Sequence, residues 1–133
     1  MLGKKRSWAI ALLSVAVIAS AILAFLLVAH ARKAEVLDIH RRFIAALVAH
    51  DMGTAYSLMS SDYRASHTLR EFVRDVNHFE APDPSAWHAS AGVCGDAEVY
   101  QTNAEGWTVG LVYVYTKDEG GWRFTGRGTY LVD

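Results

Sequence analysis

The chain has 133 residues, which is enough for one domain of ordinary size and not for two. Its formal net charge of −1 hides an uneven distribution, because all 14 acidic residues follow position 34, whereas residues 1–33 contain only basic charges. The acidic remainder argues against a nucleic acid as partner, since phosphate binding needs a basic face. The single cysteine, Cys94, excludes an intramolecular disulfide.

Residues 8–29, WAIALLSVAVIASAILAFLLVA, form an apolar run without a charge. As a helix this run measures about 33 Å, and the hydrocarbon core of a bilayer is about 30 Å thick. We therefore predict a single transmembrane helix. The alternative is a secretory signal peptide cleaved after Ala31, but the run is longer than a usual signal core and ends in the basic sequence HARK.

Basic residues flank the predicted span unevenly. Lys4, Lys5 and Arg6 precede it within residues 1–7, and Arg32 and Lys33 follow in a predicted juxtamembrane linker at 30–34. The positive-inside rule then favours a cytoplasmic N-terminus and an extracytoplasmic domain at residues 35–133.

Helical periodicity continues after the span. Residues 34–51 place Val36, His40, Phe43 and Leu47 on one stripe, which predicts an amphipathic helix ending at Gly53 in a left-handed conformation. A short helix is expected at about 54–60, and the sequence SSDYRASH at 60–67 is expected to form a polar loop. The capping box TLRE at 68–71 then begins a third helix, which is expected to run to about residue 78.

After residue 86 the period changes from 3.6 to 2. We predict strands at 87–95, 97–102, 107–117 and 122–132, with turns at NAEG and DEGG. Gly126 and Gly128 predict a bulge in the last strand. Helices followed by antiparallel strands indicate an α+β fold, in which three helices pack on a curved sheet of about four strands.

The run FIAALVAHDMGTAYSLMSSDYRASHTLREFV, together with the ending YTKDEGGWRFTGRGTYLV, resembles small bacterial NTF2-like domains. The resemblance covers about residues 35–132. It implies a cone-shaped α+β fold with a pocket between the sheet and the first helix. The family includes enzymes, ligand binders and non-catalytic accessory modules, so the fold alone does not select a function.

No catalytic constellation, metal-binding motif or cofactor motif emerges from the spacing of the polar residues. His40 lies on the apolar stripe of the first predicted helix and is the candidate residue for a ligand pocket, although a hydrogen-bonded histidine at the core edge is the simpler interpretation. Cys94 is interpreted as a small buried strand residue, with a reactive or intermolecular thiol as the alternative.

We therefore expect a single-pass protein of the bacterial inner membrane that displays a non-catalytic NTF2-like accessory module. Its expected partner is an envelope protein, a second copy of the chain or a small ligand. The alternatives are an enzyme or small-molecule carrier that uses the apolar pocket near His40, and a secreted soluble form.

Overall fold

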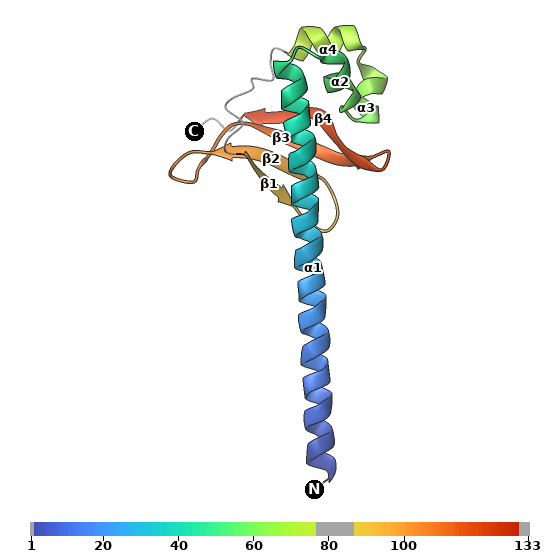
Figure 1. The fold of residues 1–133 in the computed structure, drawn as a ribbon, viewed down its shortest axis with the longest axis vertical. Coiled ribbons are helices and arrows are strands. Elements are labelled where there is room, and N and C mark those ends of the chain that lie inside the picture. The colour runs from blue at the N-terminus through green and yellow to red at the C-terminus, as the bar shows by residue number, and fades with distance from the viewer. Residues whose placement is uncertain (1, 77–86, 131–133) are drawn as a thin grey trace.

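A long helix stands against a four-stranded antiparallel sheet, and three short helices lie near its C-terminal end (Figure 1). The computed structural model describes residues 2–76 and 87–130. The predicted α+β class is confirmed, because the helices come first in the chain and the sheet packs against the long helix.

Helix α1 (Leu2–Val48) is continuous, so the apolar run, residues 30–34 and the amphipathic stripe belong to one rod. Its N-terminal part projects away from the rest of the chain (Figure 1) and contains a stretch long and apolar enough to cross a membrane. None of that stretch is buried. From Arg6 onward, the first half-buried residue of α1 is Ala29, which is also the last residue of the apolar run.

The C-terminal part of α1 carries the buried stripe that the sequence predicts. Val36, His40, Phe43 and Leu47 are all buried. The opposite side is polar and exposed, as shown by Asp38 and Arg41. The 3.6-residue period therefore orients this part of the helix correctly.

The corner after α1 differs from its prediction. The left-handed residue is His50, with φ 57°, and Gly53 lies inside helix α2 (Met52–Ser57). The amide of His50 donates to the Leu47 carbonyl and that of Asp51 to the Ala46 carbonyl, which is the Schellman arrangement. Asp51 then caps α2 by accepting from the Thr54 amide, so the next helix starts before the glycine.

A second difference lies in residues 60–67, which we expected to form a polar loop. They contain helix α3 (Ser61–Ser66), capped by the Ser60 hydroxyl that accepts from the Tyr63 amide. Helix α4 (Leu69–Asp75) begins with the predicted capping box, in which Thr68 and Glu71 bond reciprocally. The predicted end of that helix near residue 78 lies outside the described residues.

The sheet is a simple meander with strand order β1-β2-β3-β4. Its strands are β1 (Trp87–Ala91), β2 (Ala97–Thr102), β3 (Thr108–Asp118) and β4 (Gly121–Tyr130). Strand β1 is shorter than predicted, because residues 92–96 form the connection to β2. In the β3–β4 turn both Glu119 and Gly120 have positive φ, which suits a tight two-residue hairpin.

The predicted bulge in the last strand is confirmed. Tyr113 pairs with Gly128 and Tyr115 with Phe124, so β4 holds extra residues between these pairs, and Gly126 has φ 74°. A side chain at Gly126 would collide with the Tyr63 ring of α3. The bulge thus lets α3 lie close to β4.

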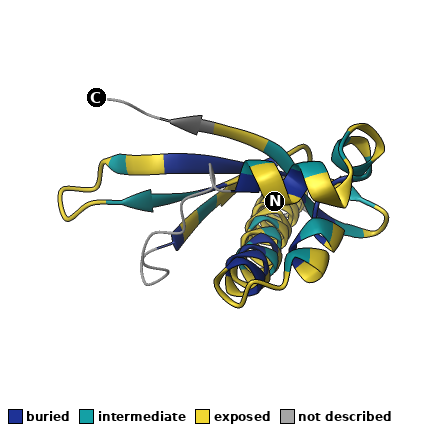
Figure 2. Ribbon diagram, turned by 90° about the horizontal axis from the view of Figure 1, so that it is seen from above, coloured by how far each residue is buried: buried dark blue, intermediate teal, exposed yellow. Residues whose placement is uncertain are grey.

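One face of the sheet packs on α1, and the residues that form the core lie on the facing sides of both (buried positions are dark blue in Figure 2). Its largest fully buried side chains include the aromatic residues of the inner sheet face and of the helices, namely Phe43, Phe72, Tyr113, Tyr115, Trp122 and Phe124. The space that the resemblance assigns to a pocket is therefore occupied by aromatic rings, with His40 among them.

Candidate functional site

His40 projects from α1 into the aromatic part of the core. Its ring centroid lies 4.2 Å from that of Trp87 and 4.7 Å from that of Tyr113, both edge to face. Its Nδ1 atom lies 2.7 Å from the hydroxyl oxygen of Tyr115. The histidine is fully buried, so this hydrogen bond fixes its ring against the sheet.

The electrostatic setting of His40 keeps the ring neutral. Burial, with a smaller contribution from the positive charge of Arg41, lowers the pKa of His40 to about 3. Burial, with a smaller contribution from Tyr113, raises the pKa of Tyr115 well above its ordinary value. At neutral pH the pair is therefore an uncharged imidazole beside an uncharged phenol.

Two polar atoms in this region have no hydrogen-bond partner among residues 2–76 and 87–130, the Nε2 atom of His40 and the Nε1 atom of Trp87. Both are buried and belong to rings in direct contact. A buried polar atom without a partner costs about 1–3 kcal/mol, so the pair marks a place where a water molecule or a polar ligand atom would be stabilised.

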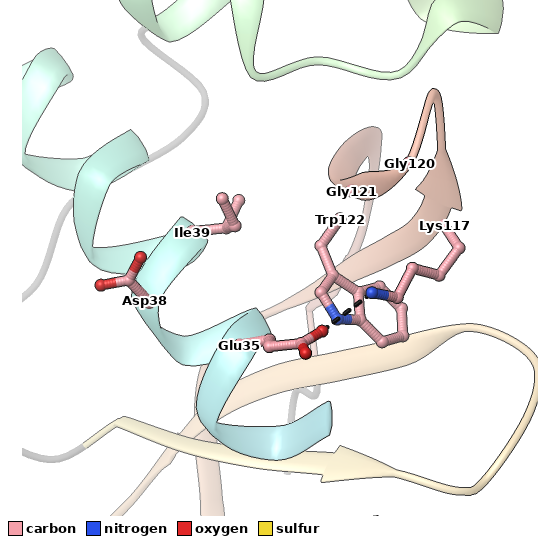
Figure 3. Close-up of a pocket in the computed structure, with 7 residues that line it drawn as sticks. All are labelled: Glu35, Asp38, Ile39, Lys117, Gly120, Gly121 and Trp122. Carbon is pink, nitrogen blue, oxygen red and sulfur yellow. Dashed lines mark hydrogen bonds and ion pairs between the residues drawn. The ribbon is translucent and has the colours of Figure 1, made fainter. Parts of the chain in front are cut away.

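A second feature is an open cleft of about 290 Å³ between α1 and the β3–β4 hairpin (Figure 3). Its lining includes Glu35, Lys117 and Trp122. The Lys117 ammonium lies 2.8 Å from the Glu35 carboxylate, and this ion pair lowers the pKa of Glu35. The carboxylate of Asp38 points away from the ion pair (Figure 3).

Trp122 connects this cleft to the end of the apolar run. The guanidinium carbon of Arg32 lies 4.8 Å from the Trp122 ring centroid, and the Lys117 ammonium lies 4.9 Å from it. Arg32 also donates to the carbonyl of Gly95 over 2.8 Å. Cations at these distances are attracted to the indole ring, so α1, the β1–β2 connection and β4 are held together at this level.

A third depression is lined by polar side chains from the α2–α3 corner and the outer part of the sheet: Ser60, Asp62, Thr116, Thr125 and Arg127. Arg127 lies 3.9 Å from Asp96, which already neutralises its charge in part. The depression gathers no nucleophile next to a base and carries no functional argument.

Cys94 lies in a different part of the fold from the one that we predicted. Cys94 is exposed in the β1–β2 connection, so its interpretation as a buried strand residue is wrong. The reason is the early end of β1 at Ala91, which moves the cysteine out of the pleat. Within residues 2–76 and 87–130, no cluster of three or more His, Cys, Asp or Glu side chains is placed to hold a metal ion.

The sequence identified His40 but not its partners. Tyr113 and Tyr115 share one face of β3, and His40 lies on the helix stripe that must cover that face. This combination could have predicted that His40 lies near the two tyrosines. No sequence pattern predicts the contact of Trp87 with His40, because this contact depends on how the edge strand β1 lies beside α1.

The chain matches no protein-family model, and it matches neither a curated protein nor a solved structure.

Proposed function

We propose that the chain is a single-pass protein of the bacterial inner membrane, whose extracytoplasmic NTF2-like domain is a non-catalytic accessory module for an envelope protein partner. The observation that carries the proposal is the unbroken helix α1, in which an exposed apolar stretch passes directly into the stripe that packs in the core of the folded domain. An apolar helix surface of this length is costly in water and favourable in lipid.

The contacts of Arg32 support an anchor over a cleaved signal peptide. Cleavage after Ala31 would cut inside α1 and make Arg32, which contacts Gly95 and Trp122, the first residue of the mature chain. The basic residues at the N-terminus support the orientation with the folded domain outside the cytoplasm.

The non-catalytic character is supported by the state of His40. A general base works best when its pKa lies near the operating pH, whereas the pKa of His40 is about 3. The ring is also fully buried among aromatic side chains, which leaves its charged form poorly solvated. The hydrogen bond of its Nδ1 atom joins it to Tyr115, whose raised pKa makes the phenol a poor acid as well.

A partner surface is supported at the β2–β3 end of the sheet. Trp107 is 66% exposed, and Val109 is exposed as well. Val109 pairs with Gln101, two residues along β2 from the buried Val99, so it points to the face that α1 covers farther along. An exposed extension of a core face next to an exposed tryptophan is typical of a binding hot spot.

The test is chemical cross-linking in intact cells, followed by purification of the full chain from membranes. We expect a defined envelope protein in the cross-linked product, lost with Trp107→Ala and retained with Glu105→Ala, a neighbouring exposed position in the same turn. Equal recovery with both variants would contradict the partner surface. Mass spectrometry of the purified chain should find an intact N-terminus, and a chain beginning at Arg32 would overturn the anchor.

A second function is favoured by one specific observation, the buried Nε2 atom of His40 and Nε1 atom of Trp87, which have no hydrogen-bond partner in the described part of the chain. A carrier of a small polar ligand would use them as hydrogen-bonding groups in an apolar surrounding. Mass spectrometry of material extracted from the purified protein tests this. A bound compound that is retained by the native chain and lost from His40→Ala would replace the accessory module with the carrier.

A further inference from the structure

The β1–β2 connection, residues 92–96, lies beside the end of the apolar run. The carbonyl oxygen of Gly95 accepts from the Arg32 side chain, and Arg32 is three residues beyond Ala29. Figure 1 shows this connection as the part of the sheet that reaches farthest toward the N-terminal end of α1. The folded domain therefore begins where the apolar run ends, without a spacer.

Helix geometry gives the depth of this connection. At about 1.5 Å per residue, Arg32 lies about 4.5 Å beyond the end of the run. The polar layer on each side of a bilayer core is about 5–7 Å thick. If residues 8–29 cross the core, then the Arg32 guanidinium and the backbone of residues 92–96 lie within that polar layer.

The composition of the connection suits this position. Residues 92–95, GVCG, have no charge, and the carboxylate of Asp96, which ends the connection, lies 3.9 Å from the Arg127 guanidinium. Val93 and Cys94 are both exposed. The cations at the same end of the domain, Arg32 and Lys33, lie next to the apolar run where lipid phosphates are found. A short apolar side chain beside basic residues is the composition that partitions into the membrane interface.

We propose that the β1–β2 connection rests in the lipid headgroup layer of the bilayer that holds α1, with Val93 and Cys94 facing the lipid. The proposal rests on the membrane anchor of the proposed function and adds a second contact with the same membrane. Two contacts fix the tilt of the domain, so the short helices and the far side of the sheet are presented away from the bilayer (Figure 1).

Cys94 provides the probe, because it is the only cysteine and is exposed. The full chain is labelled there with the environment-sensitive dye NBD and reconstituted into phosphatidylethanolamine and phosphatidylglycerol vesicles. A nitroxide on the lipid headgroup should quench the emission of this label. Two matched chains, both with Cys94→Ser, carry the label at Ala65→Cys on α3 or at Leu13→Cys in the apolar run.

We expect headgroup quenching for the label at position 94 and none for the label at position 65, whereas an acyl-chain nitroxide should quench the label at position 13. Val93→Asp should reduce the quenching at position 94, because a carboxylate is costly in the interface. If only the label at position 13 is quenched, the anchor stands and the headgroup contact is overturned. If the label at position 13 is also unquenched, the anchor fails and this proposal with it.

A blue-shifted emission at position 94 without quenching by either nitroxide would show that the label contacts protein rather than lipid. That result would also overturn the proposal.

Discussion

His40 and Tyr115 form a fully buried polar link between α1 and the centre of the sheet, with 2.7 Å between the Nδ1 atom and the phenolic oxygen. The two residues lie 75 positions apart in the chain, so the bond forms only when helix and sheet have docked. It fixes how the helix is rotated against β3, since an apolar contact alone would permit neighbouring rotations.

Removing the Tyr115 hydroxyl should therefore destabilise the fold. Tyr115→Phe leaves the buried Nδ1 atom of His40 without a partner, and we expect a loss of about 1–3 kcal/mol in the free energy of unfolding. Urea denaturation followed by circular dichroism measures it. The double variant His40→Leu with Tyr115→Phe should lose less than the sum of the single losses, because both polar groups are then absent. Additive losses would contradict the coupling.

The lowered pKa of His40 predicts acid sensitivity. An unfolded histidine has a pKa of about 6.5, whereas the folded value is about 3. Between these values the unfolded chain binds the extra proton, so stability should be complete above about pH 6.5 and fall as the pH drops toward 3. The whole interval corresponds to about 5 kcal/mol at most.

The control for this prediction is His40→Leu, which lacks the titrating group. Urea denaturation of both chains at several values between pH 7 and pH 5 separates the histidine from the carboxylates, which titrate mainly at lower pH. The native chain should lose stability over this range and the variant much less. Parallel curves for the two chains would show that His40 does not remain neutral in the fold.

Gly126→Ala, in the bulge of β4, should destabilise the fold through backbone strain and through a steric clash. Gly126→Ala would place a methyl group at positive φ and against the Tyr63 ring. We expect a loss of more than about 2 kcal/mol in the free energy of unfolding. Gly120→Ala is the matched control, because Gly120 has φ 81° but a methyl group added there would meet no other atom within 4 Å. It should lose only about 1–2 kcal/mol, and equal losses would exclude a role for the Tyr63 contact.

The cleft of Figure 3 should owe its stability to Trp122 and not to the ion pair. Trp122 is almost fully buried, so Trp122→Ala should cost about 3–5 kcal/mol. Lys117→Met removes the half-exposed charge but keeps the apolar stem, and we expect a loss of about 1 kcal/mol or less. Thermal denaturation at low and high salt checks both, and only the effect of Lys117→Met should shrink as salt rises.

Local patterns determined much of this fold. The apolar run, the stripe from Val36 to Leu47, the capping box at Thr68 and the alternation in β3 could all be read from neighbouring residues, because each reflects the period of one element. The bulge in β4 was likewise indicated by Gly126 and Gly128.

The corner at His50, the helix at Ser61–Ser66 and the early end of β1 at Ala91 were not predicted correctly. At each of these three places the neighbouring residues permit more than one local structure, and these structures have similar energies. At the corner, the Asp51 cap and the Schellman bonds together placed the left-handed residue three positions before the glycine. The packing of the helices and strands against one another then decides where each element begins and ends.

The sequence by itself determined that an apolar helix precedes an α+β domain and that His40 faces the core, because periodicity and hydrophobicity are local properties. Only the tertiary structure decided that Tyr115 and Trp87 surround this histidine and that Arg32 reaches Gly95. These contacts join residues 47 to 75 positions apart, and their formation depends on how α1 docks on the sheet, which no local pattern specifies.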